Sequence, residues 1–328
     1  MNAAQPMVSV VVVSWNARKY LKQCLESLRE GVCRLPMEVL VVDNASTDGS
    51  SEMVEQHFPN CRLIRNETNL GFAKANNIGI KASAGRYVCM VNSDVRVLPD
   101  CIRRLVDYCE AHAEVGMAGP RILGGDGRLQ RSCRGFPTLW NMFCRSLALD
   151  SLFPRCRLFG GYLLPYWEHD SLQAVDILSG CFWMVRREAL PKVGLLDEKF
   201  FMYGEDMDWC KRFWLNRWRV IFVPAAEAIH YGGASSANAP VRFFIEKQRA
   251  NLQYWKKHHH WLAQQCYFLL VCVEQAVRTV GYASALCWRS PAAGERRSKL
   301  IRGFRCLQWL LSPPTIARVV LRRRAIEI

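Results

Sequence analysis

A dense acidic cluster stands at residues 205–208, within the segment FMYGEDMDWCKRFW (201–214). Glu205, Asp206 and Asp208 follow a glycine, and bulky apolar residues come just before it. If a helix begins at Glu205, then Glu205 and Asp206 lie in its first turn, where the helix dipole favours acids, and Asp208 faces elsewhere. Charge decoration of a helix N-terminus is the simpler interpretation. The aromatic surroundings favour a carboxylate with a raised pKa that serves as a general base.

A second set of polar residues, Asn92, Ser93 and Asp94, ends the apolar run VCMV. Such a turn can simply be solvated. An Asn-x-Asp turn also offers two oxygen ligands in one direction, and oxygen ligands suit Mg²⁺ or Mn²⁺ held together with substrate phosphates. The turn therefore predicts a metal site in which Asp94 is a ligand.

Further candidate residues stand at the ends of other apolar runs. Asp43 follows VLVV, where it can cap the next helix or accept a hydrogen bond from a pyrimidine base, and both roles stay open. Ser14, Asn16 and Asn44 occupy similar strand ends, and we predict that they help to bind a nucleotide. His230 precedes a glycine pair in the segment AIHYGGASS. His230 either has a structural role or belongs to a loop on the phosphate side of the site.

These side chains can form one site only in a fold that brings the ends of the strands together. Apolar runs predict strands at 7–14, 37–43, 61–66 and 86–94, which alternate with helical patterns at 18–30, after 44 and at 71–83. The alternation indicates an α/β fold with a mostly parallel sheet, and ligands bind at the carboxyl ends of such strands. No GxGxxG follows the first strand and no GxxxxGK[ST] occurs. The phosphates of a nucleotide would therefore need another counter-charge, such as a metal.

The second half of the first 240 residues is less regular. Residues 121–167 are rich in Gly and Pro yet apolar, which predicts a lobe or lid that shapes the substrate site. A strand pair with a short helix is predicted at 174–190, a helix at the acidic cluster and a strand at 218–224. We place a domain boundary at residue 240, between a catalytic domain (1–240) and a basic helical extension (241–328).

The extension carries most of the net charge. The chain has 44 Lys and Arg against 29 Asp and Glu, a net charge of +15, and residues 241–328 hold 16 basic and four acidic residues. The apolar stretch 261–288 has Glu274 and Arg278 at its middle, an i,i+4 pair, so we predict an amphipathic helix on a membrane or on the catalytic domain rather than a span. The run His258 to His260 is predicted to form a surface or interface cluster.

Basic and aromatic residues alternate after residue 294, up to RVVLRRR near the C-terminus. This composition fits an anchor on anionic lipid, and a solvated basic tail is the alternative. No motif supports nucleic-acid binding. Fifteen cysteines include no CxxC pair, and no signal-peptide pattern opens the chain. We expect buried free thiols and a reducing, cytoplasmic compartment.

Seven segments occur in a fixed order from about Val8 to Ser236: VSVVVVSWN, VVDNASTDGS, NLGFAKANNIGI, MVNSDV, LSGCFWMVRREAL, GLLDEKFFMYGEDMDWCKR and IHYGGAS. Together they resemble the inverting family 2 glycosyltransferases, specifically the bacterial rhamnosyltransferase-like branch. The resemblance implies a GT-A fold, which is a Rossmann-like nucleotide-binding domain.

The resemblance also implies roles for the matching residues. Asp43 would contact the base of the nucleotide. Residues 92–94 fall where the family has its DxD-type motif, with Asp94 binding the divalent cation on the sugar-nucleotide diphosphate. The first acid of that motif is Asn92 here. His230 matches a histidine that assists metal or diphosphate binding in some members.

On the acceptor side, Asp206 matches the Asp of the family's acidic pair and would be the catalytic base, with Glu205 beside it. Asp208 is expected to orient the helix rather than react.

We therefore expect a Mg²⁺- or Mn²⁺-dependent enzyme that transfers a sugar with inversion, in cell-surface polysaccharide synthesis. The predicted donor is dTDP-rhamnose, with UDP-sugars as alternatives, and the predicted acceptor is a saccharide or a polyprenyl-diphosphate-linked sugar. The enzyme would lie on the inner face of the cytoplasmic membrane. Two alternatives stay open: a nucleotidyltransferase that makes the sugar nucleotide, although its glycine-rich loop is absent, and a non-catalytic scaffold with the same fold.

Overall fold

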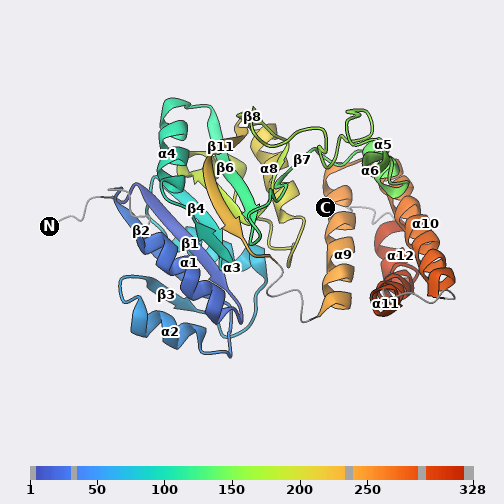
Figure 1. The fold of residues 1–328 in the computed structure, drawn as a ribbon, viewed down its shortest axis with the longest axis horizontal. Coiled ribbons are helices and arrows are strands. Elements are labelled where there is room, and N and C mark those ends of the chain that lie inside the picture. Colours follow the sequence, from blue (N-terminus) through green and yellow to red (C-terminus); the bar gives the residue numbers. More distant parts are fainter. Residues whose placement is uncertain (1–4, 31–34, 233–238, 287–292, 321–328) are drawn as a thin grey trace, which may run out of the picture.

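The computed structural model describes residues 5–30, 35–232, 239–286 and 293–320 (Figure 1). A central sheet occupies one side of the molecule and a group of long helices the other.

The central sheet has nine strands, in the spatial order β3-β2-β1-β4-β10-β6-β11-β5, with β8 beside β11. Strands β1, β2, β3, β4, β6 and β11 run in one direction, whereas β5, β8 and β10 are antiparallel to their neighbours. The prediction of a mostly parallel sheet is thus confirmed. The strands are β1 (Val8–Ser14), β2 (Met37–Asp43), β3 (Arg62–Arg65), β4 (Tyr87–Asn92), β5 (Val95–Val97), β6 (Val115–Gly124), β8 (Gln173–Ala174), β10 (Phe182–Arg186) and β11 (Arg219–His230). A separate pair joins β7 (Cys133–Arg134) to β9 (Ile177–Leu178).

Twelve helices accompany these strands in the described residues. They are α1 (Arg18–Glu30), α2 (Ser50–His57), α3 (Phe72–Ala82), α4 (Cys101–Ala111), α5 (Leu139–Ser146), α6 (Leu149–Leu152), α7 (Leu190–Val193), α8 (Glu205–Leu215), α9 (Pro240–His258), α10 (Trp261–Leu286), α11 (Ala293–Leu310) and α12 (Pro313–Val320), with a 3₁₀ turn at Arg187–Ala189.

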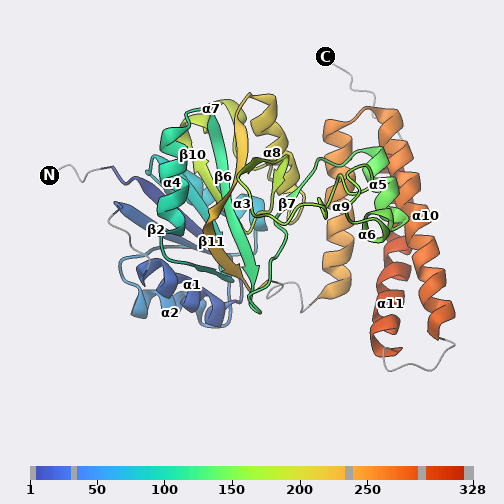
Figure 2. The ribbon, with the colours of Figure 1, turned by 45° about the horizontal axis from the view of Figure 1, so that its top comes forward.

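Apolar side chains cover both faces of the sheet, as a continuous Val-rich strand such as β1 requires. Along β1, Val8, Val10 and Val12 belong to one core, which α1, α2 and α4 complete (Figure 2). Val11 points to the opposite core, because successive side chains of a strand alternate between faces. That second core includes residues of α3 and α8, and it continues into α9, α10 and α11.

The C-terminal helices are therefore packed against the sheet-bearing part. Tyr254 and Trp255 of α9, Tyr267 of α10 and Leu310 of α11 share one buried cluster. Among the described residues, none of the helices combines the length and apolarity that crossing a bilayer requires. The predicted pair Glu274–Arg278 is present, with 2.8 Å between a carboxylate oxygen and a guanidinium nitrogen.

Two details differ from the sequence-based expectations, and two predicted segments cannot be compared with the structure. The lobe at 121–167 is more ordered than predicted, since it contains the end of β6, β7, α5 and α6, and Thr138 caps α5. The strand predicted at 218–224 continues to His230, with a register shift between Val223 and Glu227 that accommodates Pro224. The predicted loop after Gly232 and most of the RVVLRRR run fall in 233–238 and 321–328, outside the described residues.

The thirteen cysteines of the described part are all free, and nine of them are buried. Burial raises the pKa of Cys24, Cys89 and Cys210 far above the ordinary thiol value. These thiols therefore pack as small apolar side chains.

Candidate active site

A cavity of about 460 Å³ opens where the ends of β1, β4 and β11 meet α8 and α9. Seven of the ten predicted site residues line it: Asn44, Asn92, Ser93, Asp94, Glu205, Asp206 and His230. The other three do not line its wall: Ser14 and Asp43 end β1 and β2, and Asn16 follows β1. A second cavity of about 490 Å³ lies among α9, α10 and α12, away from every strand end.

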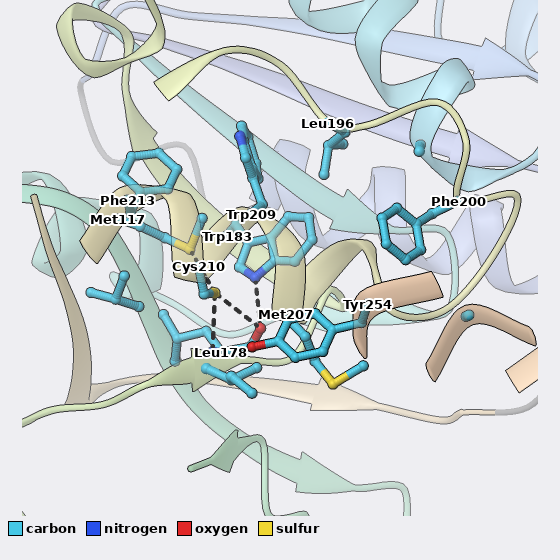
Figure 3. Close-up of a cluster of buried hydrophobic side chains, with 14 of the residues drawn as sticks. Met117, Leu178, Trp183, Leu196, Phe200, Met207, Trp209, Cys210, Phe213 and Tyr254 are labelled. Carbon is cyan, nitrogen blue, oxygen red and sulfur yellow. Dashed lines mark hydrogen bonds between the residues drawn. The ribbon is translucent and has the colours of Figure 1, made fainter. Parts of the chain in front are cut away.

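The start of α8 is fixed by the chain before it. Gly204 caps the helix with φ 80°, a left-handed conformation that favours glycine, and an added Cβ would meet Phe200 and Ala250 at 3.1 Å. The rest of α8 is held in place by buried side chains. Trp209, Cys210 and Phe213 are buried against Trp183 and Met117 in the cluster that Figure 3 shows. The N-terminal acids thus project from a rigid helix into the cavity.

Glu205 and Asp206 are neighbours with different surroundings. Burial and the adjacent charge of Asp206 raise the pKa of Glu205 to about 8, and its Oε2 atom has no hydrogen-bond partner in the described residues. Asp206 instead forms an ion pair with Arg134 of β7, and its Oδ1 accepts a hydrogen bond from the backbone N–H of Met207 at 2.8 Å. The ion pair requires the carboxylate form of Asp206. The two adjacent carboxyl groups therefore have different surroundings, as paired catalytic carboxylates typically do.

Asp208 is fully buried on another face of α8. Burial alone would raise its pKa, but a hydrogen bond from His258 and the charges of Arg212 and Lys257 outweigh burial and lower it. The contacts to Arg212, Lys257 and His258 are 2.9, 2.7 and 2.7 Å long. Of the two alternatives predicted for the run His258 to His260, a surface or an interface cluster, His258 fits the interface, because its ring bonds Asp208 and joins α9 to α8.

Asp94 and His230 face each other across β5 and β11. His230 Nε2 lies 3.2 Å from Asp94 Oδ1, its Nδ1 lies 3.2 Å from the side-chain oxygen of Gln130, and the two side chains are 13% and 11% exposed. No group of three or more His, Cys, Asp or Glu residues suited to a metal occurs in the described part of the chain. Two protein ligands beside an open cavity fit a cation that shares its coordination with substrate phosphates.

The ends of β1 and β2 leave buried polar atoms without partners. Ser14 and Asp43 are aligned in register, and Ser14 Oγ and Asp43 Oδ1 have no partner among the described residues. Asp43 Oδ2 accepts from the backbone N–H of Ser46 at 3.1 Å, so one oxygen fills the turn-capping role and the other remains open to a ligand. Unpaired buried polar atoms are costly, so these two atoms are suited to contact with a polar ligand.

Two neighbouring asparagines have structural contacts. Asn16 has φ 49° and its side-chain oxygen accepts from the backbone N–H of Thr47 at 2.7 Å. Asn44 Nδ2 donates to Asn69 at 2.8 Å, while its oxygen accepts from Asn66 and from the backbone of Leu70. Both residues shape the loops beside the cavity.

Sequence reasoning missed three cationic residues that line the cavity, namely Arg134, Arg242 and Lys247. Arg134 is separated from Asp206 by 72 residues, and no motif spacing connects them. Lys247 lies on the same face of α9 as Phe243 and Asn251, which also line the cavity. This spacing of four residues, which puts side chains on one face of a helix, was the sequence signal that could have identified Lys247.

Comparisons with known proteins identify the family. The profile described as "Glycosyl transferase family 2" matches residues 9–194, more than half of the chain. The chain belongs to glycosyl transferase family 2. It is 31% identical over 264 residues to the N-acetylglucosaminyl-diphospho-decaprenol L-rhamnosyltransferase of Mycobacterium tuberculosis, with 77% of this chain and 85% of that protein covered. It is also 34% identical over 177 residues to the succinoglycan biosynthesis protein ExoO of Rhizobium meliloti, with 51% and 49% covered.

Solved structures of glycosyltransferases share the fold of this family 2 member. The mannosyltransferase PcManGT of Pyrobaculum calidifontis, in complex with GDP-Man and Mn²⁺, superposes with a TM-score of 0.56 at 18% identity and covers 94% of this chain and 89% of that one. GalNAc-T7 with UDP, GalNAc and Mn²⁺ superposes with a TM-score of 0.54 at 16% identity, with 76% and 50% covered. The predicted GT-A fold is confirmed, followed by a basic helical region.

Proposed function

We propose that this family 2 glycosyltransferase transfers a sugar from a nucleotide donor, with inversion, to a sugar carried on a polyprenyl diphosphate. The observation that supports this most directly is that one cavity holds both Asp94 facing His230 and Asp206 beside Glu205. The first pair suits a diphosphate with its metal, and the second suits removal of a proton from a hydroxyl group.

Rhamnose from dTDP-rhamnose is the donor we propose, with UDP-sugars as the alternative. The Mycobacterium tuberculosis relative is named as an L-rhamnosyltransferase that acts on a diphospho-decaprenol-linked N-acetylglucosamine. The family assignment favours sugar transfer over the nucleotidyltransferase reaction. The oriented pair of carboxylates argues against a non-catalytic scaffold, because a scaffold has no need of a buried acid such as Glu205, whose Oε2 atom has no partner in the described residues.

In the proposed reaction the residues of the chain have separate roles. Asp43 and Ser14 bind the nucleoside, and Asn92 and Ser93 contact the ribose and diphosphate. Asp94 and His230 hold Mg²⁺ or Mn²⁺, which when bound neutralises charge on the departing diphosphate.

Asp206 accepts the proton of the acceptor hydroxyl as its oxygen bonds to the anomeric carbon. The bond from that carbon to the diphosphate oxygen breaks on the opposite face, and its electron pair leaves with the nucleoside diphosphate. Configuration is inverted in this single displacement. Neutral Glu205 beside the base adds no second negative charge next to the attacking oxygen.

A membrane-borne acceptor requires the enzyme to work at a lipid surface, and we propose that α10 and the α5–α6 region provide the contact. Exposed apolar side chains repeat along one side of α10, at spacings of seven, four, four and three residues. They are Leu262, Leu269, Val273, Val277 and Val280.

The neighbouring α5–α6 region is equally apolar. Trp140, Phe143, Leu147, Leu152 and Phe153 are exposed there, and Ser146 of α5 donates a hydrogen bond to Glu274 of α10 at 3.2 Å. Figures 1 and 2 both show α5 and α6 beside α10. Scattered exposed apolar residues are ordinary, but a contiguous group marks an interaction surface. Arg155 and Arg157, which follow α6, are exposed cations suited to anionic lipid. This surface supports our proposal that the enzyme works on the inner face of the cytoplasmic membrane.

The test of the proposed function is thermal stability measured with dTDP-, UDP- and GDP-sugars, each with and without Mg²⁺ or Mn²⁺. A ligand at about 100 times its Kd should stabilise the folded state by roughly 2.7 kcal/mol. A metal-dependent rise in Tm with one nucleotide family, followed by transfer to an N-acetylglucosamine-diphospho-lipid, is expected. The absence of any rise in Tm with every donor would contradict the proposal.

A further inference from the structure

Three cationic side chains from three separate elements, Arg134, Arg145 and Lys247, lie near one another, and Arg134 pairs with Asp206. Arg134 of β7 donates through Nη1 to the hydroxyl of Tyr162 at 3.4 Å, and the guanidinium of Arg145 of α5 lies 5.7 Å from the centre of the same ring. Lys247 reaches the cavity from α9. Burial lowers the pKa of Lys247, and the charges of Arg134 and Arg145 lower it further.

The acids around this group do not balance it. Arg134 is paired with Asp206, and Arg145 lies 3.4 Å from Asp150. Among the described residues no carboxylate lies within ion-pair distance of Lys247. Like charges held close together destabilise the protein, and an anionic ligand between them would reverse that effect. A guanidinium has five N–H donors, so Arg134 keeps free donors after its bonds to Asp206 and Tyr162.

The chemistry of inversion places this group on the acceptor side. In a single displacement the attacking hydroxyl and the departing diphosphate lie on opposite faces of the anomeric carbon. The base must touch the attacking hydroxyl, and Arg134 touches the base directly. An anion beside Arg134 and Lys247 therefore belongs to the acceptor, whereas Asp94 and His230 serve the donor.

Helix α5 links this cationic group to the apolar surface. Arg145 points to Tyr162, while Trp140 and Phe143 of the same helix are 46% and 43% exposed. A ligand with a sugar at Asp206 and a diphosphate at Arg145 would thus have its lipid chain next to exposed aromatic side chains.

We propose that Arg134, Arg145 and Lys247 form a binding site for the diphosphate of the acceptor, a prenyl diphosphate ester, one sugar ring away from Asp206. The inference rests on the proposed function and adds to it the residues that recognise the acceptor.

The decisive measurement is binding of farnesyl diphosphate by calorimetry, with the donor site saturated by Mg²⁺ and the nucleoside diphosphate that raises Tm most. Wild-type protein should bind the probe. Lys247→Gln and Arg145→Gln should each weaken binding by about tenfold, the effect of losing one charged hydrogen bond. Arg249→Gln is the matched control on α9, because Arg249 pairs with Glu246 at 2.9 Å and does not line this cavity.

Transfer kinetics give a second readout. Lys247→Gln should raise KM for a short-chain N-acetylglucosamine-diphospho-lipid by about tenfold and leave KM for an uncharged alkyl N-acetylglucosaminide unchanged. The proposed site would be overturned if Arg249→Gln weakened the binding of farnesyl diphosphate as much as Lys247→Gln does. It would also be overturned if Lys247→Gln lost affinity for the donor. Transfer without any binding of farnesyl diphosphate would also overturn it and leave the proposed function intact. Binding without transfer would support the site and contradict the function.

Discussion

The two walls of the cavity are assembled differently. In the strand-end wall, Asn92, Ser93 and Asp94 form one continuous segment that begins with the last residue of β4, and His230 ends β11, which pairs with β5. In the helical wall, Arg134 and Lys247 come from β7 and α9, and Arg145 of α5, which does not line the cavity, lies over the ring of Tyr162. The strand-end wall is fixed by sheet register, whereas the helical wall depends on how separate helices pack. We infer that the sheet-built wall serves the common donor chemistry and that the helix-built wall serves the particular acceptor.

The acids at the start of α8 lie where the two walls meet, and removing the proposed base, Asp206, gives the largest expected effect. Asp206→Asn should lower the transfer rate by about 10² to 10⁴, the usual contribution of a general base, with donor affinity retained. Rate and donor affinity are measured separately, by single-turnover transfer and by calorimetry.

Asp107→Asn is the matched control, because Asp107 lies on α4 with its side chain 65% exposed. A fully active Asp206→Asn enzyme would remove Asp206 from its role as base and would leave Glu205 as the carboxylate to examine.

The strand-end wall is tested by Asp94→Asn. Losing one charged contact to the cation should weaken metal-dependent nucleotide binding by roughly 10- to 100-fold, equivalent to about 1.5–3 kcal/mol. Affinity measured without a divalent metal should not change. Asp126→Asn, in an exposed turn, serves as control. Equal affinities of mutant and wild type for the nucleotide with Mn²⁺ would exclude Asp94 from the site.

The next prediction tests the proposed lipid-binding surface on α10, which lies outside the cavity. Val273→Glu on α10 should weaken binding to anionic vesicles by about tenfold, since burial of one apolar side chain contributes roughly 1.5 kcal/mol. The measurement is co-sedimentation at equal lipid concentration. Leu215→Glu is the matched control, because Leu215 is 65% exposed at the end of α8.

If both variants bind the vesicles equally well, the α10 surface has another partner. A truncation before α11 is a poorer test. Cys306 and Leu310 of α11 are fully buried, so their removal would expose the core that they share with α9 and α10.

The strand-end wall could be predicted from the sequence because each of its parts is local. Apolar runs followed by polar residues place Asp43, Asn92 and Asp94 at strand ends, and a parallel sheet gathers such ends at one edge. The acidic cluster was predicted for the same reason, since a glycine followed by two acids marks the first turn of a helix.

The helical wall could not be predicted, because its contacts join residues far apart in the chain. The ion pair of Arg134 with Asp206 spans 72 residues, and the hydrogen bond of His258 with Asp208 spans 50. Helical periodicity shows which face of α9 is buried but not which residues it meets. The motif-led prediction also left 95–120 unassigned, although α4 and β6 lie there.

The smallest expected effect comes from Glu205, which lies where the two walls meet. This effect is on the stability of the folded protein and not on the transfer rate. Its folded-state pKa of about 8 exceeds the ordinary value of 4.5. A raised carboxyl pKa means that the unfolded chain releases this proton at lower pH than the folded protein does. The stability associated with Glu205 is therefore complete below about pH 4.5, falls as pH rises, and is lost above about pH 8.

Glu205→Gln keeps a neutral side chain of the same shape and should remove this loss. We expect the Tm of the variant to exceed that of wild type by a few degrees at pH 9 and by less at pH 6. Glu188→Gln, at an exposed site, should show no such trend. A Tm difference that is the same at both pH values would show that Glu205 is ionised in the folded protein. In that case two adjacent negative charges would share the start of α8, and Arg134 would have to neutralise both.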